Sequence, residues 1–350
     1  MRFSLQQHLG MSALATCLAL TLPLASGVAQ AEESGDSVKE GRLFIADHTQ
    51  PVVRAINFET GKELGRYDMK GYAALTASAS GKTVFATQSD SDIVHVIKTG
   101  IVFSDHGEHR DLDVEDTALL PVTFEGKRPF HVVPHDDHAI LFYDRGGKAE
   151  IIDEAALLDG KAKVRTVDTT APHHGVAVTM GRYVLVSVPN TQIETKPDTL
   201  PPRIGLRVLD REGKQVGEQA TCTDLHGEAT SARLAAFGCK EGILVAQPGG
   251  TDGPKLEMLA YPEDFPKAYT GTLLGGKSMQ FFLGNYGEDK VVLIDPDSKD
   301  AFRLVELPTR RVDFILDPAN PRNAYILTED GDLHVLDVLE GALTRKAKVT

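Results

Sequence analysis

Short runs of β-branched and aromatic residues, separated by turns rich in Gly, Asp and Asn, recur along almost the whole chain. Such runs indicate β-strands, and only 154–158 hints at a helical turn. The strands fall into groups that repeat every roughly 40 to 50 residues, which is the length of one propeller blade. The last group is the clearest, and its four predicted strands are 312–317, 323–328, 332–337 and 345–350. The sequence therefore predicts an all-β fold, a β-propeller.

The same four-strand unit begins near six positions, and one incomplete unit precedes them. The incomplete unit starts at Arg42 on what looks like a second strand. We expect a β-propeller domain over 42–350 with about seven four-stranded blades, the first without its inner strand. Either residues 37–40 supply that strand, or a longer full-length chain continues past Thr350, where an eighth blade could follow. The six complete units begin near Tyr72, Pro129, His173, His226, Thr270 and Val312.

Residues 1–31 have the organisation of a secretory signal peptide. Arg2 supplies its positive charge, 13–24 is a mostly apolar run, and a small-x-small cleavage pattern follows. The apolar run is too short to span a membrane, so we expect export to the periplasm without membrane insertion. The mature chain would begin at Glu32, with a flexible N-terminal segment over 32–41.

The cysteines fit an exported protein. Cys17 lies within the signal peptide, and a lipid anchor there is the weaker alternative because Thr16 is a poor preceding residue. Cys222 and Cys239 remain after cleavage, an even number in an oxidising compartment, which predicts a structural disulfide. They flank a predicted hairpin whose turn lies near Ser231, so they can sit opposite one another across the first two strands of a blade.

The chain carries a formal net charge of −13 at pH 7. An acidic balance disfavours nucleic-acid binding, which needs a basic face, and it suits a soluble protein that handles cations. The sequence also lacks a Cys-x-x-Cys-His haem motif, a Gly-x-Ser-x-Gly nucleophile elbow and a phosphate-binding glycine loop.

Three histidines occupy equivalent positions in three consecutive predicted blades. His131 follows Arg-Pro-Phe, His174 stands in Pro-His-His-Gly, and His226 stands in Asp-Leu-His-Gly-Glu. Since the first strand of each blade lines the centre of a propeller, three adjacent blades would present these imidazoles to one point. Three imidazoles with a carboxylate or water as fourth ligand form a zinc site. The alternative is that each His caps its strand and bonds a neighbouring backbone.

A second group of potential ligands lies in the predicted surface loop 98–120. His106 and His109 have His-x-x-His spacing, and Asp111 is one of three carboxylates beside them. Such a loop could bind a second metal ion, although a solvated polar loop is an equal alternative. The histidines and aspartates of 135–138 are better explained as a turn between two strands.

Several motifs together resemble the AztD family of periplasmic zinc metallochaperones, which are exported β-propellers. The resemblance covers essentially the whole mature chain. It implies a monomeric carrier without enzymatic turnover, which binds Zn²⁺ and passes it to the AztC-like solute-binding protein of a zinc ABC importer. The motifs are Asp-His-Gly-Glu-His at 105–109, Arg-Pro-Phe-His at 128–131, Ala-Pro-His-His-Gly at 171–175, Cys-Thr-Asp-Leu-His-Gly-Glu-Ala at 222–229, Ala-Phe-Gly-Cys-Lys-Glu-Gly at 236–242 and Gly-Asn-Tyr-Gly at 284–287.

The resemblance also implies roles for individual residues. Its central zinc ligands would be His131, His174 and His226, with His173 as the alternative to its neighbour, and the outer group would be His106 and His109 with Asp111. Two departures stand out: 31–41 holds no His, whereas family members can carry a His-rich segment there, and the family continues past the end of this sequence.

Two other functions use the same predicted fold. A metal-dependent propeller hydrolase, such as a lactonase, would activate water at an open fourth position on the ion. A metal-free interaction scaffold would use the histidines only as structural residues. Hydrolase activity with a bound metal would indicate the first, and absence of zinc after reconstitution would indicate the second.

Overall fold

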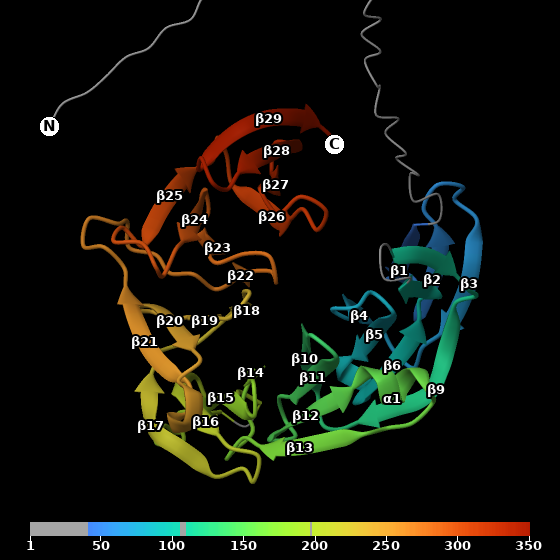
Figure 1. The fold of residues 1–350 in the computed structure, drawn as a ribbon, viewed down its shortest axis with the longest axis horizontal. Coiled ribbons are helices and arrows are strands. Elements are labelled where there is room, and N and C mark those ends of the chain that lie inside the picture. Colours follow the sequence, from blue (N-terminus) through green and yellow to red (C-terminus); the bar gives the residue numbers. More distant parts are fainter. Residues whose placement is uncertain (1–40, 106–109, 197) are drawn as a thin grey trace, which may run out of the picture. The chain divides into compact units, whose positions relative to one another are not determined.

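Seven sheets of a β-propeller follow one another around a ring in chain order in the computed structural model, which describes residues 41–105, 110–196 and 198–350 (Figure 1). Residues 40–350 form one compact unit. Six of the sheets have four strands and the first has three. The prediction of seven blades, with an inner strand missing from the first, is therefore confirmed over the described residues. The segment 37–40 lies outside them.

Blades 1 and 2 are antiparallel sheets of consecutive strands, interrupted by a hairpin inserted in blade 2. Blade 1 comprises β1 (Arg42–Asp47), β2 (Val52–Asn57) and β3 (Glu63–Asp68). Blade 2 comprises β4 (Ala74–Ala77), β5 (Thr83–Gln88), β6 (Ile93–Lys98) and β9 (Ala118–Glu125), with the 3-10 helix η1 (Ser89–Ser91) between β5 and β6. The inserted hairpin consists of β7 (Ile101–Asp105) and β8 (Arg110–Val114).

The inserted hairpin corrects one prediction. The sequence predicted a surface loop over 98–120, but β7 and β8 pair in a regular antiparallel register. Ile101 lies opposite Val114 and Phe103 opposite Leu112. Such β-branched and aromatic cross-strand pairs stabilise a hairpin even where one face is exposed. The sequence did not predict this pairing because the charged run 105–111 separates the two apolar segments.

Blades 3 and 4 follow the same plan, and the predicted helical turn is present. Blade 3 comprises β10 (Pro129–His135), β11 (His138–Tyr143), β12 (Lys148–Asp153) and β13 (Val164–Asp168), with α1 (Glu154–Leu158) between the last two. Asp153 caps α1 by accepting a hydrogen bond from the Ala156 amide. Blade 4 comprises β14 (Ala177–Met180), β15 (Tyr183–Pro189), β16 (Arg203–Leu209) and β17 (Gln215–Thr221).

Blades 5 to 7 complete the series. Blade 5 comprises β18 (Glu228–Thr230), β19 (Ala235–Gly238), β20 (Gly242–Gln247) and β21 (Lys255–Ala260), with the 3-10 helix η2 (Gly250–Asp252) before β21. Blade 6 comprises β22 (Leu273–Leu274), β23 (Phe282–Tyr286), β24 (Lys290–Ile294) and β25 (Phe302–Glu306). Blade 7 comprises β26 (Arg311–Leu316), β27 (Asn323–Thr328), β28 (Asp332–Asp337) and β29 (Ala342–Lys348).

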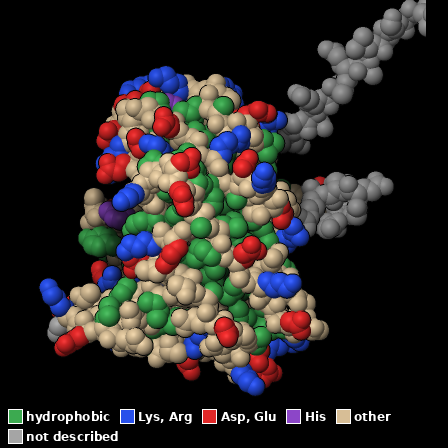
Figure 2. Space-filling view, turned by 90° about the vertical axis from the view of Figure 1, so that its left-hand side faces the viewer, with side chains coloured by type: hydrophobic (Ala, Val, Ile, Leu, Met, Phe, Trp, Pro, Cys, Tyr) green, Lys and Arg blue, Asp and Glu red, His purple; other side chains and the backbone are tan. Residues whose placement is uncertain are grey.

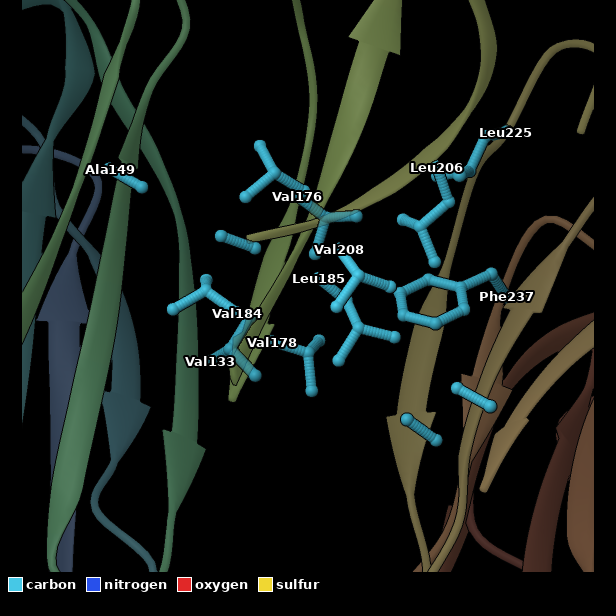
Figure 3. Packing of buried hydrophobic residues seen from close by; sticks show 14 of the residues in the cluster. Val133, Ala149, Val176, Val178, Val184, Leu185, Leu206, Val208, Leu225 and Phe237 are labelled. Carbon is cyan, nitrogen blue, oxygen red and sulfur yellow. The ribbon is translucent and has the colours of Figure 1, made fainter. Parts of the chain in front are cut away.

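The hydrophobic core is divided into clusters that lie between neighbouring blades. The largest joins blades 3, 4 and 5, and Figure 3 shows Val133, Leu185, Leu206 and Phe237 converging within it. The second strands of blades 2 to 5 are deeply buried, and all six residues of β5 are buried. Because both faces of these strands pack against other blades, the strands appear in the sequence as continuous apolar runs. This packing fixes the inner strands, which lie nearest the centre of the ring (Figure 1).

The surface carries charges of both signs. Figure 2 shows Lys and Arg side chains interspersed with Asp and Glu over the face in view. Among the described residues, no helix is long and apolar enough to cross a membrane.

Candidate metal centre

Three predicted ligands, His131, His174 and His226, meet at the inner edges of blades 3, 4 and 5. His131 lies in β10, while His174 lies three residues before β14 and His226 two residues before β18. The ring centroids of His131 and His174 are 4.7 Å apart, those of His174 and His226 5.5 Å, and those of His131 and His226 6.4 Å. Three imidazoles bound to one tetrahedral ion would have ring centres about 5 Å apart. The structure therefore brings the three rings to one point, and zinc ligation by them stays a prediction.

The spacing of two ring nitrogens fits a metal ion closely. The Nε2 atoms of His131 and His174 lie 3.2 Å apart. Two nitrogens bound to a tetrahedral Zn²⁺ at their usual bond lengths are about 3.3 Å apart. Hence this pair could take up the ion with little movement of either ring.

A buried carboxylate orients His174. Asp144, which follows β11 in blade 3, is 1% exposed, and its Oδ2 accepts a hydrogen bond of 2.8 Å from His174 Nδ1. With its proton on Nδ1, His174 has a lone pair on Nε2, the atom that faces His131. The other carboxylate oxygen of Asp144, Oδ1, is buried without a hydrogen-bond partner. Asp144 thus places a carboxylate against His174, and Arg128 Nε lies 3.8 Å from the same Oδ2.

A backbone carbonyl orients His226. Its Nδ1 donates a hydrogen bond of 2.7 Å to the carbonyl oxygen of Gly271, which precedes β22 in blade 6. This bond also places the proton on Nδ1 and leaves the Nε2 lone pair available for a metal ion. Each of the two histidines is therefore held by a blade next to its own. His226 is the exposed member of the three, whereas His131 and His174 are partly buried.

His131 is kept neutral by its surroundings. Burial, followed by repulsion from His174, His226 and Arg203, lowers the pKa of His131 to about 3. Only a neutral imidazole has a lone pair for a metal ion, so this shift favours ligation at ordinary pH. Phe130 lies edge-on to both His131 and His174, with centroids 5.3 and 4.7 Å away, and is 42% exposed. It covers two of the three rings from solvent.

The structure distinguishes the two neighbouring histidines, which the sequence could not. His173 is fully buried, its Nδ1 donates to the carbonyl oxygen of Ala171 at 2.8 Å, and its Nε2 accepts from the hydroxyl of Ser187 at 2.8 Å. Burial also lowers the pKa of His173 to about 4. Because both ring nitrogens already bond protein groups, His173 has no free lone pair, and the geometry favours His174 as the ligand.

The predicted outer group is only partly described. His106 and His109 lie outside the described residues. Asp111 lies in β8 of the inserted hairpin and is exposed.

The polar group at 135–138 forms the turn that the sequence predicted. His135 and His138 are paired across the β10–β11 hairpin, and Asp136 has a positive φ of 47°. His135 and Asp136 also line a cavity of about 440 Å³ beside turns of blades 2, 4, 5 and 6. Lys277 from blade 6 forms a salt bridge with Asp136 at 2.6 Å.

One further group of ligand-type side chains occurs among the described residues, and no sequence motif predicted it. Potential ligand atoms of Asp330, Asp332 and His334 lie within 4.8 Å of one another in blade 7. Thr328 joins them, since its hydroxyl donates to Asp330 at 2.6 Å and lies 3.2 Å from His334 Nε2. Asp332 is neutralised by Lys346 at 2.8 Å. These bonds explain the group as the network that closes the β27–β28 turn.

The predicted disulfide is present. Cys222 and Cys239 are bonded, with their Cα atoms 5.0 Å apart. Cys222 directly follows β17, the last strand of blade 4, and Cys239 directly follows β19 of blade 5. The bond therefore joins the connection between blades 4 and 5 to the end of β19, and it does not lie across the first two strands of one blade as predicted. The hairpin turn runs from Ser231, whose amide donates to the Leu234 carbonyl, close to the predicted position.

Comparisons with known proteins agree with this architecture. No protein-family model matches the chain. The chain is 42% identical to the zinc chaperone AztD of Citrobacter koseri over 316 residues, which cover 90% of this chain and 73% of that protein. Two crystal structures from the same organism also match at 42% identity. The apo structure superposes with a TM-score of 0.82, covering 88% of this chain and 82% of the other. A second AztD structure gives 0.83, covering 88% and 81%. On this similarity over most of both chains, the protein belongs to the AztD family.

Proposed function

We propose that this protein is a periplasmic zinc metallochaperone, which carries Zn²⁺ and transfers it to the solute-binding protein of a zinc ABC importer. The observation that carries the proposal is the convergence of His131, His174 and His226, with two Nε2 atoms at the separation that a tetrahedral zinc ion requires. The relative from Citrobacter koseri is named a zinc chaperone, which supports zinc as the cargo.

The geometry favours carriage of the ion. Asp144 and the Gly271 carbonyl hold two imidazoles in the tautomer that presents Nε2, and burial keeps His131 neutral. Three protein ligands leave one tetrahedral position for a ligand from an acceptor protein. As each acceptor ligand binds, one imidazole can leave, so the ion passes across without being released to water. A hydrolase would use the same position for water, and the zinc-chaperone name of the relative favours the carrier.

Zinc titration tests the central site. The wild-type chain, purified without an affinity tag, is expected to bind one tightly held zinc ion at the three histidines. A triple variant, His131→Ala, His174→Ala and His226→Ala, should lose that ion, as metal analysis by mass spectrometry would show. Undiminished tight binding by the folded triple variant would refute this site.

Transfer and hydrolysis assays separate the carrier from its alternatives. A carrier loaded with zinc should pass it to the solute-binding protein faster than zinc appears on a small chelator, because transfer goes through a complex. The same preparation should hydrolyse no ester or lactone. Hydrolysis that depends on the metal would indicate an enzyme, and absence of zinc after reconstitution would indicate a scaffold.

The remaining parts of the proposal concern the whole chain. Residues 1–31 direct export and are removed, and 42–350 is the propeller domain, which acts as a monomer. The predicted flexible segment 32–41 lies, except for Gly41, outside the described residues. His106 and His109, which lie outside the described residues, form an outer zinc-binding group with Asp111 of β8. Mass spectrometry of the periplasmic protein tests the cleavage before Glu32, and a His106→Ala, His109→Ala variant should bind less zinc per chain.

A further inference from the structure

The carbonyl group that holds His226 is itself held by an asparagine. Asn285, in β23 of blade 6, accepts hydrogen bonds through Oδ1 from the amides of both Gly271 and Thr272, at 2.8 and 2.6 Å. The backbone N–H of Asn285 in turn donates to the Thr272 carbonyl at 3.1 Å. The backbone that bonds His226 is therefore held by the side chain of Asn285 together with one backbone hydrogen bond from the same residue.

One rigid peptide unit links the two side chains. The Gly271 carbonyl and the Thr272 N–H belong to the same peptide group, which is planar, so their directions are coupled. Asn285 binds the N–H end at 2.6 Å, and His226 Nδ1 binds the carbonyl end at 2.7 Å. Fixing the N–H end thus aims the carbonyl at the imidazole. Hydrogen bonds at the two ends of one peptide group also polarise and strengthen each other.

Close packing limits how this segment can move. The preceding amide, of Thr270, donates to the Tyr261 hydroxyl at 2.9 Å. A Cβ added at Gly227 would lie 2.6 Å from the Gly271 carbonyl oxygen, and one at Gly238 would lie 2.1 Å from the Thr270 carbonyl oxygen. Only glycine fits at these two contacts, so the segment cannot shift toward blade 5. It can still rotate about the bonds at Gly271, which lacks a side chain to hinder rotation.

We propose that Asn285 is a positioning residue for the metal centre: through the Gly271–Thr272 peptide it fixes the ring orientation and the Nδ1–H tautomer of His226, and so sets how long zinc is retained. This inference rests on the proposed zinc-binding function. His226 is the exposed member of the three histidines and the one held by a neutral carbonyl, whereas His174 is held by the buried carboxylate of Asp144. His226 is therefore the ligand that leaves first, and Asn285 governs that step.

Three variants test the proposal in the full mature chain loaded with zinc. Asn285→Ala removes both hydrogen bonds, and Asn285→Asp restores an oxygen that can accept them. Asn57→Ala is the matched control, because Asn57 also accepts two backbone amides through Oδ1, from Glu59 and Thr60 at 3.1 and 2.9 Å, but does so in blade 1. The first readout is the rate of zinc loss to an excess of chelator. The second is the ¹⁵N chemical shift of the His226 ring in metal-free protein, which reports its tautomer.

We expect Asn285→Ala to lose zinc roughly 10- to 100-fold faster, the usual effect of removing a group that orients a metal ligand. Its His226 ring should show a mixture of tautomers. Asn285→Asp should remain close to wild type in both readouts, and Asn57→Ala should change neither. If Asn285→Ala does not fold, Asn285→Ser, whose hydroxyl is too short to reach both amides, takes its place with the same expectation.

Two results would overturn the proposal. One is a disrupting variant with the wild-type tautomer and the wild-type rate of zinc loss. The other is an equal acceleration in Asn57→Ala, which would indicate general loosening of the propeller. A failure of the proposed function is distinguishable, because the wild-type chain would then bind no zinc, while the tautomer of His226 would still respond to Asn285.

Discussion

Asp144 and His174 link two neighbouring blades: the buried carboxylate of Asp144 accepts a hydrogen bond of 2.8 Å from the partly buried imidazole of His174. Carboxylates that orient metal-binding histidines typically contribute 10- to 100-fold to metal affinity. We therefore expect Asp144→Asn to weaken zinc binding by about that factor, because a neutral amide favours the Nδ1–H tautomer less. Competition with a chelator of known affinity measures the change. Asp295→Asn, at a turn after β24, is the control and should bind zinc like the wild type.

The fold was predictable because the strands and turns of each blade follow one another in the sequence as apolar runs separated by turn residues. In blade 7, the predicted strands 323–328 and 332–337 coincide with β27 and β28. The fourth strand was placed too late, at 345–350 against Ala342–Lys348 for β29, because its exposed Ala-Leu-Thr start lacks apolar alternation. The β7–β8 hairpin was not predicted because the charged run 105–111 favours a loop, although paired apolar residues flank it.

The sequence predicted the three histidines of the candidate metal centre but not the groups that orient them. Histidines are rare enough that their repetition at one place in three blades predicts convergence, and the rings do converge. The groups that orient them have no such signature. Asp144 looks like any aspartate after a strand, and the bond from His226 to Gly271 depends on how blades 5 and 6 pack. Burial likewise favours His174 over His173 as the predicted ligand, and the sequence of two adjacent identical residues cannot show which of them is buried.

Substitution of the two neighbouring histidines should separate structure from binding. His173→Ala removes a buried ring with two hydrogen bonds and an edge-on contact to Phe142, so we expect a loss of about 2 to 4 kcal/mol in the free energy of unfolding. His174→Ala should cost little stability and abolish tight zinc binding. Denaturant unfolding and zinc titration on both variants measure the two effects. The reverse pattern would make His173 the ligand.

The free energy of unfolding should depend on pH partly through the protonation of His131. Its pKa is about 3 in the folded chain, against about 6.5 in an unfolded one, so the unfolded state binds an additional proton between these values. The contribution of His131 to stability is therefore present above pH 6.5 and decreases as pH falls toward 3. We expect metal-free wild type to lose more stability than His131→Gln between pH 7 and pH 4.5. Parallel curves from urea unfolding would show that His131 is not buried as a neutral ring.

The disulfide should matter both for stability and for the zinc centre. Closing a loop of this size, with a sequence separation of 17 residues, stabilises a protein by about 3 kcal/mol. The His226 amide donates to the Gly238 carbonyl, directly before Cys239, so the bond also anchors the backbone that carries a proposed ligand. We expect the Cys222→Ser, Cys239→Ser double variant to unfold at lower denaturant concentration and to lose zinc faster than wild type, but more slowly than His226→Ala. Reduction of wild type by a phosphine reductant, which unlike a dithiol does not compete strongly for zinc, should reproduce both changes and leave the double variant unaffected. A double variant that retains wild-type zinc release while losing stability would confine the disulfide to a structural role.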